Sequence, residues 1–93
     1  MVTAFVHIST EPLAIDGVAR SVAELPGVRD AYSVSGADAD VIAIVRVPDV
    51  DDVRDLVTEH VAKLPGVTRT RTSLAYREYS SAEIGAAYEG FGD

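Results

Sequence analysis

Few side chains in this 93-residue sequence are equipped for chemistry. There is no cysteine, which excludes disulfides, thiolate nucleophiles and thiolate metal sites. The two histidines, His7 and His60, lack a second ligand at metal-binding spacing, so packing or surface roles are favoured. No Walker, dinucleotide-binding, Gly-x-Ser-x-Gly or His-Glu-x-x-His pattern occurs. The sequence therefore predicts no catalytic residue, no cofactor and no metal site.

The segment best suited to binding is the turn SGADAD, from Ser35 to Asp40. A glycine turn exposes backbone N–H groups, and Asp38 or Asp40 adds a negative charge beside them. Together these groups could hold the carboxylate and the ammonium of a free amino acid. Taken alone, the same residues favour a simpler interpretation, a glycine-mediated hairpin. Thr70 and Thr72 add hydroxyls to one face of a later strand, although threonine also simply favours strands.

The turn leads into an uninterrupted apolar run, Val41-Ile42-Ala43-Ile44-Val45. Such a run, bounded by turn residues, predicts a strand that is covered on both faces. A chain of this length has few elements with which to cover both faces. We therefore expect that something outside the chain supplies the second cover.

The remaining elements can be placed around this strand. We expect strands at 2–9, 28–35, 40–47 and 67–79, helices at 13–25 and 49–64, and a short last helix at 81–88. Leu-Pro-Gly-Val ends both long helices, at 25–28 and 64–67, thirty-nine residues apart. The chain is thus βαβ twice over. Right-handed crossovers then give an α+β, ferredoxin-like βαββαβ fold, with two helices on one face of a four-stranded antiparallel sheet.

This fold leaves one face of the sheet without helices. Ile42 and Ile44 alternate with Val41, Ala43 and Val45, so one of the two sets must lie on the bare face. A bare apolar sheet face in a protein of this kind usually marks an interface. We expect an obligate homodimer that packs sheet against sheet, in a dimeric α/β-barrel-type association.

Bulk composition excludes some classes of partner. The net charge is −7, from fifteen acidic and eight basic residues, which disfavours direct nucleic-acid binding. Arg69 and Arg71 are a local exception, which we interpret as part of a solvated strand face. The N-terminus resembles no signal peptide, and no apolar stretch could span a bilayer. We expect a cytoplasmic protein without membrane contact, forming one domain over residues 1–93.

Several segments together resemble one known family. TAFVHI, LPGV, DAYSVSG, the Gly/Asp turn, DVIAIVRV and LPGVTRTRTSLAYREY occur in an order similar to the effector-binding (RAM) domain of Lrp/AsnC transcription regulators. The resemblance covers about Val2–Tyr79, which would be the core, followed by a short helical tail at 80–93. Full-length members carry an N-terminal helix-turn-helix. Because the first strand here begins at Val2, we expect a stand-alone effector domain without a DNA-binding domain.

The resemblance implies a function and a site. It implies a non-catalytic, amino-acid-binding sensor whose dimers assemble into rings, such as octamers or decamers, with the effector between dimers. Such a module could co-assemble with full-length relatives. The implied ligand-binding residues are Ser35, Gly36, Asp38, Asp40, Thr70 and Thr72. The family has two residues between the turn glycine and its aspartate, whereas this chain has three, so either aspartate could take the role. We favour Asp40 because it adjoins the strand at Val41.

Two alternatives remain open from the sequence. Small dimeric barrels of this fold include cofactor-free monooxygenases and isomerases, and His7 is the residue that would support such an enzyme. A pocket that holds His7 with a second titratable group would favour this alternative. The other alternative is a purely structural oligomerisation module, in which the Gly36 turn binds nothing.

Overall fold

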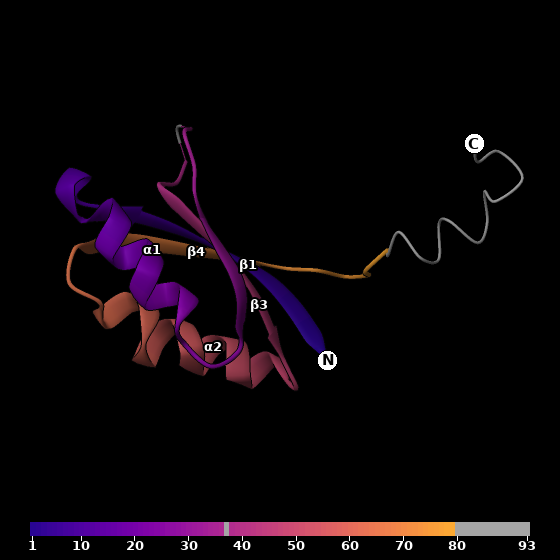
Figure 1. The fold of residues 1–93 in the computed structure, drawn as a ribbon. Helices are drawn as coiled ribbons and strands as arrows, with labels where there is room; N and C mark the ends of the chain where they lie inside the picture. The colour runs from indigo at the N-terminus through magenta and orange to yellow at the C-terminus, as the bar shows by residue number, and fades with distance from the viewer. Residues whose placement is uncertain (37, 80–93) are drawn as a thin grey trace, which may run out of the picture.

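The computed structural model describes residues 1–36 and 38–79. Its sheet has the strand order β2-β3-β1-β4, and every neighbouring pair is antiparallel (Figure 1). The predicted βαββαβ order is confirmed. The elements are β1 (Val2–Thr10), a 3-10 turn η1 (Pro12–Ala14), α1 (Ile15–Ala23), β2 (Val28–Ser33), β3 (Val41–Val47), α2 (Val50–Glu59), a second 3-10 turn η2 (Val61–Lys63) and β4 (Val67–Leu74).

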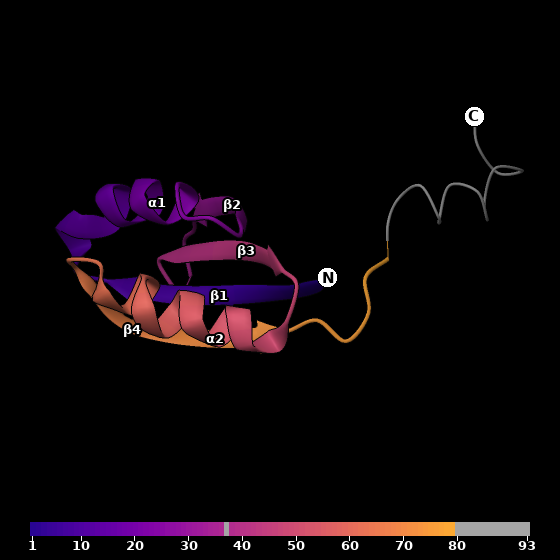
Figure 2. The ribbon, with the colours of Figure 1, turned by 90° about the horizontal axis from the view of Figure 1, so that it is seen from below.

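The core lies between the sheet and the two helices, which cover the same face. Figure 2 shows α1 near β2 and α2 near β4. The two central strands supply its most deeply buried side chains: Ala4, Val6 and Ile8 from β1, and Val41, Ala43 and Val45 from β3. The helices add Val18, Val22, Val53 and Leu56 to the same cluster. Alternate residues of β1 and β3 thus form the covered face, as the sequence predicted.

Several predicted boundaries differ from the structure. The second helix was expected over 49–64 but ends at Glu59, before η2, and the second strand ends at Ser33 rather than at residue 35. The first helix was expected over 13–25, but the chain first makes a 3-10 turn at Pro12–Ala14, and α1 is shorter. β4 was expected to continue to residue 79, but it ends at Leu74. The N–H of Ala75 still bonds to Thr3 O (2.9 Å), and β1 itself begins one residue before Thr3, so no further partner strand remains. The predicted helix at 81–88 lies outside the described residues.

Two side chains do not lie where simple periodicity predicts. Alternation along β2 predicts Val28 and Tyr32 on one face, but the register shifts between Val28 and Asp30. Val28 lies opposite the buried Val45, whereas Tyr32 lies opposite Ile42 on the other face. In α2, helical spacing places Val50 in one apolar stripe with Val53 and Val57, which predicts burial, but Val50 is 52 % exposed. Leu56, which lies outside that stripe, is buried in the helix instead.

The turn residues behave as their chemistry suggests. Asp49 lies just before α2, and its N–H donates to the Asp52 carboxylate at 3.0 Å. Gly27 and Gly66, in the two Leu-Pro-Gly-Val segments, both adopt φ of +93°. Glycine adopts this left-handed region without the steric penalty that other residues incur. The sequence repeat is therefore a repeat of backbone conformation.

Candidate functional site

Asp40 joins three strands at the base of the β2–β3 hairpin. Its backbone carbonyl accepts the N–H of Val34 (2.9 Å), and its own N–H donates to Ile8 O (2.9 Å). Its carboxylate Oδ2 accepts the N–H of Thr10, also at 2.9 Å. The side chain is half-buried. Asp40 therefore stabilises the end of β1, and one of its carboxylate oxygens is already engaged.

The other predicted hairpin residues lie at its exposed tip. Ser35, Gly36 and Asp38 are all exposed, while the neighbouring Ala39 is buried at 7 %. A Cβ placed on Gly36 would meet nothing within 4 Å, and its φ is not in the left-handed region. The tip is thus open to a ligand or to another molecule. None of the three pockets found among residues 1–36 and 38–79 is lined by these tip residues.

The two predicted threonines lie on the far side of β1 from the hairpin. Thr70 pairs with Ile8 and Thr72 pairs with Val6, so both belong to the face that carries the helices. Asp40 bonds to the same Ile8 from the β3 side. The structure thus places Thr70 and Asp40 on opposite flanks of one residue, about two strand spacings or roughly 10 Å apart. A single chain does not gather the six predicted residues around one described pocket.

A groove between α2 and β4 was missed by the sequence analysis. It has a volume of about 300 Å³ and is lined by Val50, Val53, Arg54, Val57, Thr58, Thr72 and Leu74. Val50 and Leu74 are about half-exposed, at 52 % and 46 %. The sequence does contain a signal that could have predicted this groove. On β4, polar threonines occupy the face that lies opposite the apolar stripe of α2. Thr72 therefore borders this groove rather than the hairpin tip.

The second face of the sheet, here called the open face, carries no helix. Cross-strand register assigns to it Thr3, Phe5, His7 and Ser9 of β1, Asp30 and Tyr32 of β2, Ile42, Ile44 and Arg46 of β3, and Arg69, Arg71 and Ser73 of β4. Phe5 is 37 % exposed and Tyr32 is 52 % exposed. Ile42 and Ile44 are half-buried even in a single chain. The expectation of an apolar centre on this face is confirmed.

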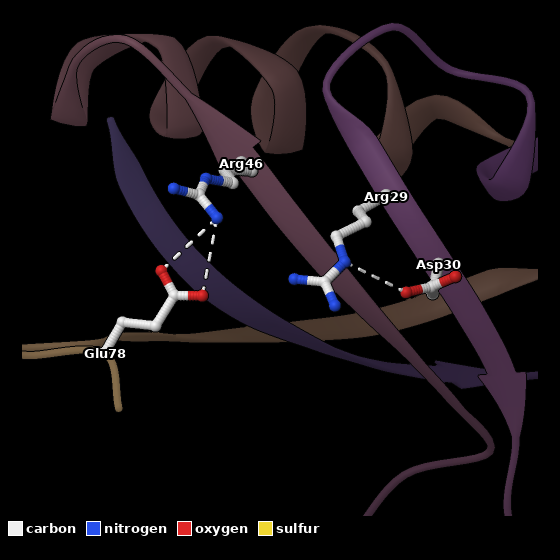
Figure 3. A network of polar contacts seen from close by, with 4 residues as sticks. All are labelled: Arg29, Asp30, Arg46 and Glu78. Atoms are coloured by element: carbon white, nitrogen blue, oxygen red, sulfur yellow. Dashed lines mark hydrogen bonds and ion pairs between the residues drawn. The ribbon is translucent and has the colours of Figure 1, made fainter. Parts of the chain in front are cut away.

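Two ion pairs flank the open face. Figure 3 shows the Arg46 guanidinium facing the Glu78 carboxylate, with Nη1 3.3 Å from one oxygen and 3.4 Å from the other. Arg29 lies beside Asp30, with 3.4 Å between Nε and Oδ2. All four side chains are substantially exposed, so each pair contributes little to stability. The Arg46 pair connects the segment after β4 to the end of β3.

His7 does not lie where an active site would need it. Its cross-strand neighbours on the open face are Ile42 and Arg71, and it lines none of the three described pockets. His60 is exposed, beyond the end of α2. The enzyme alternative therefore gains no support from the described residues. In the same residues, no helix is long and apolar enough to cross a membrane.

Comparison with known proteins identifies this arrangement of elements. The family model for the Lrp/AsnC ligand binding domain matches residues 3–84. An uncharacterized helix-turn-helix-type transcriptional regulator of Pyrococcus abyssi is 33 % identical over 73 residues, which are 78 % of this chain and 46 % of that protein. The chain therefore spans about half the length of this relative.

Solved structures agree with the family match. The protein TTHA0845 from Thermus thermophilus superposes with a TM-score of 0.80 at 42 % identity, over 86 % of this chain and 99 % of that one. A feast or famine regulatory protein from M. tuberculosis, complexed with L-methionine, superposes with a TM-score of 0.71 at 25 % identity, over 86 % of this chain and 53 % of that one. With its fold and most of its length matched, the chain belongs to the Lrp/AsnC ligand-binding domain family.

Proposed function

We propose that this chain is a non-catalytic, amino-acid-binding sensor module of transcription regulation. The observation that carries the proposal is the family match over residues 3–84. It is supported by the M. tuberculosis relative of the same fold, which is complexed with L-methionine. Binding would act by mass action, because a ligand held by one assembly state stabilises that state over the others.

The β2–β3 hairpin is the proposed ligand site. Backbone N–H groups at its tip would donate hydrogen bonds to the ligand's carboxylate, and an aspartate would accept a hydrogen bond from the ligand's ammonium group. Asp40 remains the favoured aspartate: Thr10 occupies Oδ2, and no hydrogen bond to Oδ1 occurs among the described residues. The exposed Asp38 is the alternative. The open tip and the distant threonines suit a site that a neighbouring copy completes.

The oligomer that completes the site is also part of the proposal. The open face, with Phe5, Ile42 and Ile44 at its centre, would form a homodimer, and dimers would assemble into larger rings such as octamers or decamers. Full-length Lrp/AsnC relatives in the cytoplasm would be further partners. They would supply the DNA contact that this acidic domain, at −7 net charge, is unsuited to make.

The test is calorimetric titration of the protein with each common amino acid, together with its thermal unfolding temperature. We expect one class of amino acid to bind and to raise that temperature; at one hundred times the dissociation constant, the stabilisation would be about 2.7 kcal/mol. Asp40→Asn keeps an oxygen that can accept the Thr10 N–H but loses the charge, so affinity should fall at least tenfold in a folded protein. Asp38→Asn is the matched control.

Three results would change the proposal. An affinity lost in Asp38→Asn but retained in Asp40→Asn would move the ammonium contact to Asp38. Wild-type affinity in both variants would show that neither aspartate contacts the ligand. If no amino acid binds or stabilises the protein at millimolar concentration, the sensing function is wrong and the structural-module alternative replaces it.

A further inference from the structure

His7 is a titratable residue to which the proposed amino-acid site gives no role. It lies on β1, one of the two central strands of the sheet, and its register assigns it to the open face. Its neighbours directly across the strands are Ile42 of β3 and Arg71 of β4. His7 is half-buried in a single chain, so any molecule that covers the middle of the open face would bury it further.

Two arginines of β4 lie beside His7. Arg71 is directly opposite, where the Cβ atoms of paired strands are about 5 Å apart, and Arg69 is the diagonal neighbour, at about 7–8 Å. Neither arginine forms an ion pair among residues 1–36 and 38–79. Like charges that face each other across paired strands are destabilising. A protonated His7 would therefore meet two cations that no salt bridge in the described part of the chain neutralises.

The carboxylates near His7 are distant and already engaged. Asp30 of β2 is two strand spacings from β1, roughly 10 Å, and pairs with Arg29. The carboxylate of Asp40, at the base of the hairpin, accepts the N–H of Thr10, which is three residues or roughly 10 Å along β1 from His7. Both distances exceed the screening length of about 8 Å at physiological ionic strength.

The remaining polar groups of the open face do not offset the two arginines. Arg46 of β3 is a further cation, but it lies four residues or roughly 13 Å farther along the strands and pairs with Glu78. Tyr32 of β2, in the same cross-strand row as His7, is uncharged near neutral pH. The other side chains that β1 and β3 place on this face carry no charge. The excess charge around His7 is therefore positive.

Dimerisation would sharpen this imbalance. In the homodimer proposed above, the second copy brings its own His7 and the same two arginines to the covered face, and water no longer screens these groups fully. Because β1 is a central strand, His7 would enter the covered area whatever the angle between the two sheets. Histidine is the side chain whose charge normally changes between about pH 5 and pH 8. A neutral His7 suits such a seam, whereas a protonated His7 does not.

We infer that His7 makes the homodimer pH-sensitive, because protonation of its imidazole, opposed by Arg71, weakens the association of the two chains in mild acid. This inference rests on the dimer proposed above and adds a condition under which it loosens. Separated or unfolded chains bind the proton more readily than the dimer does, so dimer stability falls as the pH falls. The net charge of −7 acts in the opposite direction, since acid reduces overall repulsion, but charges outside the open face lie mostly beyond the screening length.

Urea denaturation at several protein concentrations measures the stability of the dimer. Its midpoint depends on protein concentration only if unfolding also separates the chains. Between about pH 7.5 and about pH 5.5, we expect the equilibrium constant for unfolding and dissociation to rise at least tenfold, since each dimer holds two copies of His7. A midpoint that is independent of concentration at the higher pH overturns the dimer itself and this inference with it. A concentration-dependent midpoint with an unchanged equilibrium constant overturns only the pH sensitivity.

The two histidines of the chain provide a matched pair of variants. His7→Gln keeps a polar side chain but cannot take up a proton in this range, so the equilibrium constant should change less than about threefold between the two pH values. His60→Gln removes the exposed histidine beyond α2 and should retain the full rise. Only the ratio between the two pH values is compared, so a loss of stability common to both does not obscure the result. A full rise in His7→Gln, or its loss in His60→Gln, contradicts the assignment to His7.

Arg71→Gln tests the cause while His7 stays in place. Arg71 is exposed on an edge strand, so the variant should fold as the wild type does. Without the cation opposite His7, the tenfold rise should shrink to about threefold or less. Arg20→Gln, on the exposed surface of α1, makes the same charge change away from the open face and should retain the full rise. A full rise in Arg71→Gln would show that repulsion from Arg71 is not the cause and would overturn the inference.

Discussion

The two Leu-Pro-Gly-Val turns and the turn from Ser35 to Asp40 all contain a glycine, but only the first two depend on it. Gly27 and Gly66 share φ of +93°, and a Cβ on either would collide with a neighbouring side chain. Their carbonyls each accept an N–H from the adjacent strand end, from Arg46 and from Glu11, both at 2.8 Å. Gly36 has neither constraint.

The glycines that the fold requires are therefore different from the glycine of the proposed binding site. The two Leu-Pro-Gly-Val turns start β2 and β4 in register, so their glycines serve the fold. In the hairpin, that role belongs to Asp40, which bonds to β1 and to the chain just after β2. Gly36 lies at the exposed tip, and neither a close contact nor a left-handed φ within the described residues requires a glycine there. A glycine that the fold does not require is available for a ligand to approach closely.

The largest expected effect is that of Gly66→Ala. The new methyl would overlap the Ala14 side chain of η1, and the residue would also be held at an unfavourable φ. Strain and overpacking together should lower the free energy of unfolding by about 3 kcal/mol or more. Urea denaturation measures it. The control is Gly17→Ala in α1, where a Cβ meets nothing, which should stabilise the protein by about 0.5–1 kcal/mol.

Gly27→Ala should destabilise less than Gly66→Ala, although φ is the same. Its Cβ would meet Val47 Cγ1 at 2.8 Å, which is the end of a side chain rather than a Cβ fixed to the backbone of a neighbouring turn. Val47 can shift more readily than Ala14, so we expect a loss of about 2 kcal/mol, mostly backbone strain. The measurement is the same urea titration. A loss larger than that of Gly66→Ala would show that Val47 cannot move.

The fold could be predicted because its signals are local and repeated. The apolar run at 41–45 and the two Leu-Pro-Gly-Val segments specify strand and helix ends without reference to distant residues. The errors arose where pairing between strands decides the outcome. The end of β4 depends on where β1 begins, and the orientation of Val28 depends on a register shift against β3. Neither the end of β4 nor the orientation of Val28 can be deduced from the local sequence alone.

The candidate site was harder to predict than the fold. The sequence singles out Asp40, but its bond to Thr10 N spans thirty residues and requires the sheet order to be known. Thr70 and Thr72 were grouped with the hairpin, yet the register assigns them to the helix-bearing face, and Thr72 borders the groove against α2. The proposed site, which a neighbouring copy would complete, would leave even less local signal, because its parts would meet only in the assembly.

The smallest effect on stability, and the most informative about function, should come from Gly36→Ala. With open space around the Cβ and no left-handed φ, the free energy of unfolding should change by less than about 0.5 kcal/mol. The added methyl would nevertheless stand where a ligand's carboxylate must approach the backbone N–H groups. Amino-acid affinity, measured by calorimetry, should therefore fall at least tenfold while the dimer, measured by light scattering, stays intact. Unchanged affinity would show that the ligand does not contact Gly36, and a large loss of stability would show that the tip serves the fold after all.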